Sequence, residues 1–294
     1  MNSLTNSFNY SFNNIFLIGT SHVALESIEK IKKGFSISPE IVAVELDVNR
    51  AVSLESDFIE KTKEKREHEI DKKKGKQQEK QQQKETIKEK IKKNLSLIKE
   101  IGFLGFLFYL LGKEMQEKYG SILNINPGLD MYEAIKLARE KNLEIYFIDR
   151  DIKITLKRFS KNIKKREIIK IIFQFIISPF YFIYESFLTL ISNLFNITNN
   201  NKQKNKKNKK KEIDLTKVPS NELIDYILKE VKKEYPSIYK VLIDERDLFM
   251  AKKLFILSKK NPDKKILAVV GAGHLKGILT YLEKLSESHA DIAY

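Results

Sequence analysis

The sequence predicts an α/β fold with a central mixed, partly parallel sheet flanked by helices and interrupted by helical and Lys-rich insertions. Four short β-branched apolar runs have the length and composition of buried strands. Each run is followed by a polar or glycine-bearing segment and then by a helical pattern, and this alternation is typical of a partly parallel sheet. The four predicted strands are residues 15–18, 41–44, 144–148 and 266–270.

Three helices are predicted from apolar periodicity. Residues 27–33 continue a helix that begins near His22, and residues 131–141 form an amphipathic pattern. Residues 221–234 form the third, and Ser220 precedes them as a candidate N-cap.

The chain is interpreted as an N-terminal tail, residues 1–14, followed by one domain, residues 15–294. The tail has no basic start and no apolar centre, so we do not expect a secretory signal. Two polar segments interrupt the domain. Residues 61–93 are rich in Lys, Gln and Glu, as in an exposed helix or linker, and residues 199–212 are a low-complexity Lys/Asn linker.

The net charge of +15 arises almost entirely from these two insertions. The first holds fourteen Lys and Arg against seven Asp and Glu, and the second holds seven Lys against one Glu. The rest of the chain is near neutrality, which gives no basic face for specific nucleic-acid binding. Solvated insertions are the simpler interpretation, and contact with anionic lipid or RNA is the alternative. The absence of cysteine excludes disulfides and thiol nucleophiles and is compatible with a cytoplasmic domain.

Two apolar stretches are candidates for membrane contact. Residues 101–112 are too few for a span, which needs about 20 apolar residues. Residues 168–197 are interrupted by Lys170, Pro179 and Glu185. We expect buried or interfacial helices, and the aromatic side chains of residues 168–197 leave membrane-surface contact open.

Two of the four histidines end the same GxxH pattern, each directly after a predicted strand. Two such patterns exceed what 11 Gly and 4 His provide by chance. Glycine allows a tight turn there, and the carboxyl ends of strands line the ligand crevice of α/β sheets. Both histidines are therefore expected to face one crevice. The patterns are Gly19-Thr20-Ser21-His22 and Gly271-Ala272-Gly273-His274.

Glu45 closes the predicted strand at residues 41–44 and completes the candidate site. Two imidazoles and one carboxylate are a recurrent metal set that leaves a position for water. We expect His22, His274 and Glu45 to hold a divalent ion, with Zn, Mn and Co all compatible. Glu26, four residues after His22, is expected to ligate, orient His22 or act as general base. The competing interpretation is a set of satisfied structural residues.

Two arginine-bearing clusters add candidate catalytic residues. Arg150 follows the strand at residues 144–148, at the sheet edge expected for the histidines. Glu245 and Arg246 open a helical run. An arginine in a crevice can grip a carboxylate or stabilise an oxyanion, and a structural Asp–Arg pair is the alternative.

Five stretches together resemble the TraB (pheromone-shutdown) family, in the expected order and over most of the chain outside the insertions. They are residues 19–27 (GTSHVALES), 39–51 (PEIVAVELDVNRA), 127–158 (starting PGLDMYEA), 242–254 (LIDERDLFMAKKL) and 269–278 (VVGAGHLKGI).

The resemblance implies an α/β fold shared with the Tiki metalloproteases, in which paired GxxH motifs and a strand-end Glu form the presumed active centre. Those positions fall on His22, His274 and Glu45, and the family's DRD and ERD arginines fall on Arg150 and Arg246. TraB proteins are associated with inactivation of peptide pheromones, and many continue into membrane-spanning helices after GHLxGI. This chain stops at Tyr294, which leaves a trimmed domain and an anchorless member as alternatives.

Three functions follow as hypotheses. The first is a metallopeptidase that hydrolyses small peptides at the His22–Glu45–His274 centre. The second is a non-catalytic protein that sequesters a peptide or small ligand in the same crevice. The third is a structural protein that acts on a membrane surface or RNA through its Lys tracts.

Overall fold

The structure is a computed structural model that describes residues 9–21, 25–56, 58, 87–123, 128–173 and 220–290. Two compact units are distinguished, one formed by Met1–Asn162 with Leu215–Tyr294, the other by Ile163–Asp214. In the second unit, residues 165–173 are helical. Of the two predicted insertions, residues 61–86 and 199–212 lie outside the described residues.

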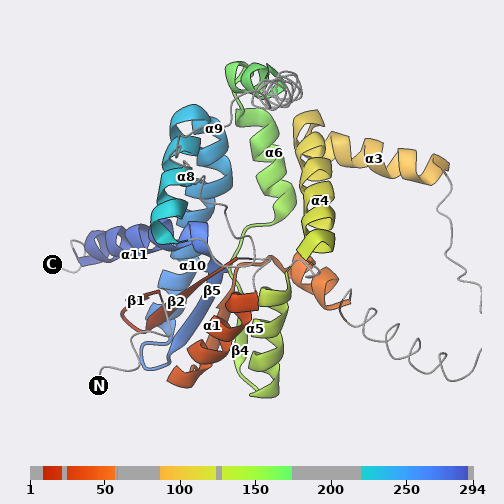
Figure 1. Ribbon diagram of the computed structural model, residues 1–294. Helices are drawn as coiled ribbons and strands as arrows, with labels where there is room; N and C mark the ends of the chain where they lie inside the picture. Colours follow the sequence, from red (N-terminus) through yellow and green to blue (C-terminus); the bar gives the residue numbers. More distant parts are fainter. Residues whose placement is uncertain are drawn as a thin grey trace, which may run out of the picture. The chain divides into compact units, whose positions relative to one another are not determined.

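Five strands in the first unit form one mixed sheet in the order β1-β2-β5-β3-β4 (Figure 1). The pairs β2–β5, β5–β3 and β3–β4 are parallel, and β1 pairs antiparallel with β2. The predicted fold class is confirmed. The strands are β1 Tyr10–Phe12, β2 Ile15–Thr20, β3 Ile41–Val44, β4 Glu144–Phe147 and β5 Ile266–Gly271.

Strand β1 lies in a segment that the sequence analysis assigned to the tail. It forms a hairpin with β2 through Asn13 and Asn14, and Asn13 adopts a positive φ of 50°. Asparagine tolerates this left-handed conformation and is favoured in tight hairpin turns. The three-residue strand is too short for a periodic signal, which is why the sequence did not reveal it.

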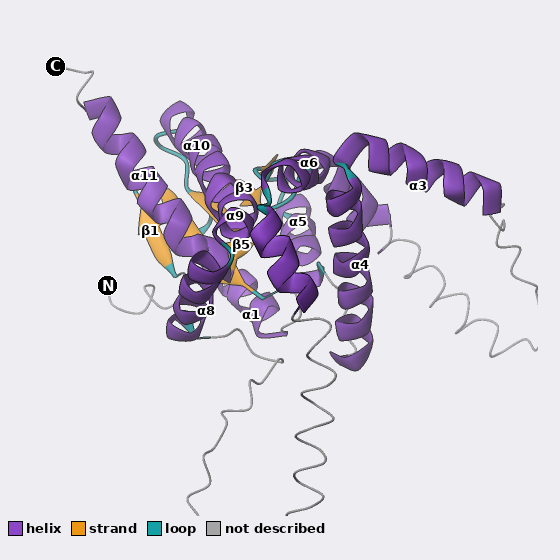
Figure 2. Ribbon diagram, turned by 90° about the horizontal axis from the view of Figure 1, so that it is seen from above, coloured by secondary structure: helices purple, strands orange, loops and turns teal. Residues whose placement is uncertain are grey.

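Helices cover both faces of the sheet because each buried strand contributes apolar side chains to both (Figures 1 and 2). One face packs on α1 (Leu25–Gly34) and α5 (Leu129–Glu140), and the other packs on α10 (Glu245–Lys260) and α11 (Leu275–Ala290). In β3, for example, Val42 and Val44 enter the first core, whereas Ile41 and Ala43 enter the second. Strands buried on both faces show continuous apolar runs, as parallel strands do.

The remaining helices are shorter or lie beside this three-layer core. Ser220 caps α8 as predicted, because its hydroxyl accepts the Leu223 N–H at 3.3 Å. These elements are α3 Ile87–Ile101, α4 Phe103–Leu123, α6 Ile152–Asn162, α8 Asn221–Glu234, α9 Pro236–Tyr239, the π-helix η3 Lys240–Asp244 and the 3₁₀ turns η1 Phe35–Ile37 and η4 Ala272–His274.

Helices α3 and α4 meet at a sharp bend at Gly102, whose φ of +80° suits glycine. In the described part of the chain, no single helix is both long and apolar enough to cross a membrane. The α3–α4 pair meets those criteria only when it is taken together across its bend of 118°. Of the predicted apolar stretch at residues 168–197, only residues 168–173 are described.

The order of the strands makes the carboxyl end of β5 a candidate ligand site. The segment after β5 leads into α11 on one face of the sheet, whereas the segment after its neighbour β2 leads into α1 on the opposite face. Strand ends at which the following segments diverge in this way are where open α/β sheets usually bind ligands.

Candidate functional site

Glu45 lies at the carboxyl end of β3, buried against the last residue of β5. Its Oε2 accepts the Gly271 N–H at 2.6 Å, and its own N–H donates to the Val269 carbonyl at 3.0 Å. Gly271 thus serves the site through its backbone. A carboxylate that accepts a backbone N–H in a buried position is held in one orientation.

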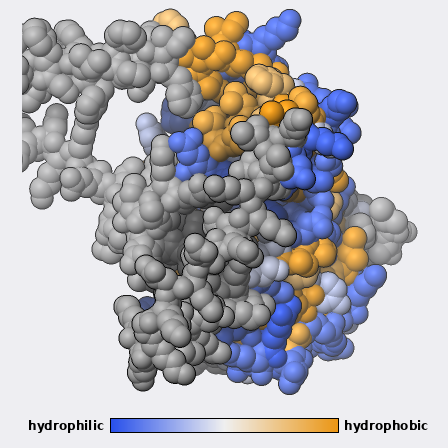
Figure 3. All heavy atoms as spheres, turned by 90° about the vertical axis from the view of Figure 1, so that its right-hand side faces the viewer, coloured by the Kyte–Doolittle hydropathy of each residue, from blue (hydrophilic) through white to orange (hydrophobic). Residues whose placement is uncertain are grey.

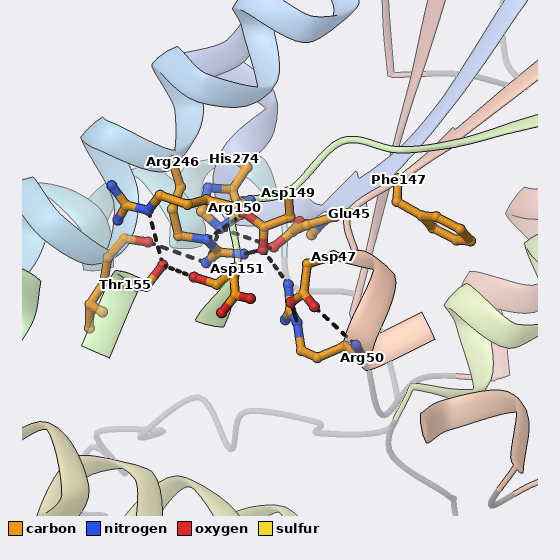
Figure 4. Close-up of polar contacts among 12 residues, drawn as sticks. Glu45, Asp47, Arg50, Phe147, Asp149, Arg150, Asp151, Thr155, Arg246 and His274 are labelled. Carbon is orange, nitrogen blue, oxygen red and sulfur yellow. Dashed lines mark hydrogen bonds and ion pairs between the residues drawn. The ribbon is translucent and has the colours of Figure 1, made fainter. Parts of the chain in front are cut away.

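Arg246, from the first turn of α10, occupies the centre of the cluster (Figure 4). Its Nη2 donates to the carboxylates of Glu45 and Asp149, the latter at 2.7 Å, and its Nε donates to Asp149 at 3.1 Å. Burial alone would lower the pKa of Arg246, but these two carboxylates raise it above its ordinary value. The guanidinium therefore stays charged and ties β3, β4 and α10 together.

His274 follows β5 in the turn η4 and is buried between an aspartate and the Arg246–Glu45 pair. Its Nδ1 contacts Asp247 Oδ1, and its Nε2 lies 3.1 Å from Arg246 Nη1 and 3.4 Å from Glu45 Oε1. The tautomer with its proton on Nδ1 satisfies both neighbours, because Nδ1–H donates to Asp247 and Nε2 accepts from Arg246. The second GxxH histidine and the predicted glutamate thus come together.

The surroundings shift the protonation of this histidine–aspartate pair. Burial raises the pKa of Asp247 to about 6, against the opposing contact with His274. Burial alone would lower the pKa of His274, but Glu45 and Asp247 raise it above its ordinary value. Buried titratable groups with displaced pKa values are concentrated at functional sites.

Three consecutive residues of α10 point in three directions at this site. Glu245 receives two N–H groups of Arg158, at 2.6 and 2.7 Å, while Arg246 enters the cluster and Asp247 holds His274. The π-helix η3 directly precedes them, and such single-turn π segments occur often at functional sites. The Arg158 guanidinium holds the pKa of Glu245 below its usual value.

Arg150 is buried and bonded to protein groups on the α6 side of the cluster. It donates to the Thr155 hydroxyl at 3.1 Å, to the Val241 carbonyl at 3.2 Å and to Glu245 at 3.1 Å. The structure therefore places the predicted residues Arg150 and Glu245 against each other. The hydrogen bonds of Arg150 join η3 and α10 to the end of β4.

A second arginine lies against Asp149 from the other side. Arg50, in the helical residues 48–56, donates to Asp47 at 2.6 Å and also contacts Asp149. Sequence reasoning named neither Asp47 nor Arg50 as a site residue. Both follow strand β3 within six residues of its end, and that position is the signal that could have found them.

The first GxxH segment begins beside the second one in the sheet, since Thr20 pairs with Gly271 in the parallel ladder. The Thr20 hydroxyl donates to buried Asp130 at 2.6 Å, which ties the end of β2 to the first turn of α5. The Ser27 hydroxyl bonds both the N–H and the carbonyl of Ser21. His22 itself lies outside the described residues. Asp130 is a further residue that sequence reasoning missed.

Three other predicted positions are Glu26 at the start of α1, Gly19 in β2 and Gly273 in η4. Glu26, in the first turn of α1, pairs with Lys30 at 2.9 Å. Gly19 is packed so closely that a side chain there would meet Leu275. At Gly273 an added Cβ would meet nothing within 4 Å, so packing does not require glycine there.

The described atoms around Glu45 and His274 do not fit a divalent metal ion as they stand. The Arg246 guanidinium contacts both of the atoms that would ligate it, His274 Nε2 and Glu45 Oε1. No group of three or more metal-ligating side chains occurs among the described residues. Because His22 is outside them, the three-ligand centre stays a prediction.

With this geometry in place, comparisons with known proteins become informative. The profile of the TraB/PrgY/gumN family matches residues 9–292, nearly the whole chain. The chain belongs to this family. The family predicted from five sequence stretches is thus confirmed.

A curated relative of this TraB-family chain is the "Uncharacterized protein MJ1365" of Methanocaldococcus jannaschii. The two are 37% identical over 276 residues, which is 94% of this chain and 55% of the relative. The chain thus spans about half the length of the relative. The relative's name assigns no activity.

Gly277 of the VVGAGHLKGI stretch makes room for the Asp247 carboxylate, which an added Cβ at this position would strike. A Gly277→Ala variant should lose about 1–3 kcal/mol of unfolding free energy, although alanine normally stabilises a helix. Chemical denaturation measures this difference. Gly273→Ala, where a Cβ meets nothing, is the matched control and should change little. Equal stability of the two variants would contradict the assigned packing.

The pH dependence of stability should report the Asp149–Arg246 pair. Burial alone would raise the pKa of Asp149, but Arg246 and Arg50 bring it below its ordinary value of 3.8. The ionised carboxylate therefore stabilises the fold above pH 3.8, and this stabilisation disappears as the pH falls through the lower folded-state pKa.

An Asp149→Asn variant should be destabilised by about 3–5 kcal/mol at pH 7, because it leaves a buried guanidinium underpaired. The deficit should shrink as the pH falls below 3.8. Denaturation across this pH range tests both statements, with the exposed Glu140→Gln as control. A deficit that is absent at pH 7, or that grows in acid, would overturn the assignment.

Proposed function

We propose that this TraB-family protein hydrolyses amide bonds of small peptides at the cluster formed by Glu45, His274 and Arg246. The observation that carries the proposal is the placement of His274, held by Asp247 on one nitrogen and facing Glu45 and Arg246 with the other. A base, a fixed carboxylate and a fixed cation at the ends of parallel strands are the components of a hydrolytic centre.

In this proposal His274 is the general base. Nδ1–H stays bonded to Asp247, and Nε2 takes a proton from a water molecule whose oxygen attacks the peptide carbonyl carbon. Asp247 then stabilises the imidazolium, as the aspartate of histidine–aspartate pairs does in hydrolases. The same nitrogen returns the proton to the leaving amine when the C–N bond breaks.

Arg246 is assigned the role of stabilising the negative charge that develops on the carbonyl oxygen. Its Nη1–H points at His274 Nε2, so an entering water or carbonyl competes for this donor. Glu45 and Asp149 fix the guanidinium before substrate arrives, so little reorganisation is needed during the reaction. Both carboxylate oxygens of Glu45 accept hydrogen bonds, so Glu45 serves to hold this donor in place.

The metal-assisted form expected from the sequence adds Zn, Mn or Co held by His22, His274 and Glu45. When bound, such an ion would polarise the carbonyl and acidify water. The present arrangement accommodates it only if Arg246 withdraws from the donor atoms. The side chains alone therefore carry the steps given above, and metal dependence is an experimental question in its own right.

The catalytic test uses a library of short peptides read by mass spectrometry. The native chain should produce cleaved peptides, and His274→Ala should lower the rate about 10²–10⁴-fold, the usual contribution of a general base. Glu45→Gln should also slow cleavage, because it removes the charge that holds Arg246.

Glu144→Gln is the matched control, since Glu144 begins β4 at the opposite end of the sheet and is exposed. It should cleave at the native rate. Stoichiometric capture of peptides with unchanged mass would instead support the sequestering alternative. Cleavage that survives both His274→Ala and Glu45→Gln would exclude this centre.

Removing the guanidinium should open the centre to metal. We expect Arg246→Ala to bind Zn²⁺, Mn²⁺ or Co²⁺ at least about tenfold more tightly than the native chain, because a neighbouring cation and a steric block are gone. Isothermal titration calorimetry and the metal-induced shift of Tm measure this.

Arg246→Gln, which keeps a hydrogen-bond donor, serves if the alanine variant does not fold. Arg158→Ala is the control, because Arg158 donates to Glu245 rather than to either expected metal ligand. Tighter metal binding by the native chain than by both Arg246 variants would show that the guanidinium does not obstruct the ion.

A further inference from the structure

The first part of α4 is apolar on two opposite faces. One face packs on α6, where the rings of Phe108 and Phe159 lie 4.6 Å apart and Gly105 lies against Leu156. A surface helix of a soluble domain normally has polar residues on its other face. Here the sequence of this part, FLGFLFYLLG, contains no charged residue.

The opposite face of α4 is an exposed apolar stripe. Its members are spaced i, i+4, i+7 and i+8, which places them on one side of the helix. Their exposed fractions lie between 37% and 64%. These residues, named the α4 stripe below, are Phe103, Leu107, Leu110 and Leu111.

Helix α3, which precedes the bend, adds exposed apolar and basic side chains. Ile91 and Leu95, one turn apart, are exposed, and exposed Lys92 and Lys99 lie close to Leu95 on the helix circumference. Along its whole length α3 holds five Lys against two Glu. Figure 3 looks onto the side that carries α3 and α4 and shows hydrophobic atoms gathered beside hydrophilic ones.

The second unit shows the same combination by itself. In its helical residues 165–173, Ile169, Ile172 and Phe173 are exposed at helical spacing. Lys165 and Lys170 belong to the same short helix. An apolar face bordered by lysines therefore occurs in both units.

We propose that the α4 stripe and the adjoining part of α3 bind the surface of an anionic phospholipid bilayer. The stripe would enter the boundary between headgroups and acyl chains, and the α3 lysines would contact anionic headgroups, as amphipathic surface helices do. A second copy of the chain fits this face less well, since two α3 helices with excess Lys repel each other.

The test compares two triple variants in flotation with vesicles of phosphatidylglycerol and phosphatidylcholine. The first is Phe103→Ser, Leu107→Ser and Leu110→Ser in the stripe. The control, Tyr226→Ser, Ile227→Ser and Ile256→Ser, changes side chains of comparable exposure, 44% to 64%, on α8 and α10. Neither triple alters a charge, so attraction of the Lys-rich insertions to lipid is equal in both.

The stripe variant should partition at least about tenfold more weakly than the native chain, because each lost apolar side chain removes a favourable transfer term. The control variant should bind like the native chain. Neutral phosphatidylcholine vesicles or high salt should weaken native binding.

Three results would overturn the proposal. The native chain fails to float with anionic vesicles, the two variants lose binding equally, or the stripe variant binds undiminished. Analytical ultracentrifugation of the same proteins tests whether a second copy of the chain covers this face instead. A native chain that is dimeric, together with a stripe variant that alone is monomeric, would assign the face to a second copy. Peptide cleavage is measured separately, without lipid. Failure of lipid binding can therefore be distinguished from failure of the proposed hydrolase.

Discussion

The buried guanidinium of Arg246 is the contact on which the candidate site depends. It bridges Glu45 at the end of β3 and Asp149 at the end of β4, and it touches His274 after β5. Without it, two buried carboxylates would face each other in a poorly solvated position, where Glu45 raises the pKa of Asp149. One side chain of α10 thereby makes an otherwise unfavourable cluster of charges stable.

The parallel sheet explains why these groups meet at all. Their backbones are far apart in sequence, yet strands β2, β5 and β3 end side by side. Helices α11 and α1 leave neighbouring strand ends toward opposite faces, which is the arrangement at which open α/β sheets usually bind ligands. The hydrolase proposal and its sequestering alternative both use this sheet edge, and they differ only in whether His274 transfers a proton.

In two places the side chains depart from the usual distribution, in which charged groups are exposed and apolar groups are buried. Charged side chains are buried around Arg246, whereas apolar side chains of α4 are exposed. Either departure costs free energy in an isolated domain. The first is the site of the proposed hydrolase, and the second is the extended apolar surface that we propose binds lipid.

The sequence by itself determined the family, the α/β class, four of the five strands and the pairing of Glu45 with His274, because strand periodicity and strand-end motifs are local. Tertiary structure alone decided that Arg246 rather than Arg150 contacts Glu45 and His274, and that Asp247 holds the imidazole. Which side of a helix faces a strand end depends on how α10 and its preceding π-helix pack. That packing is set by contacts across the whole core, which no local pattern contains.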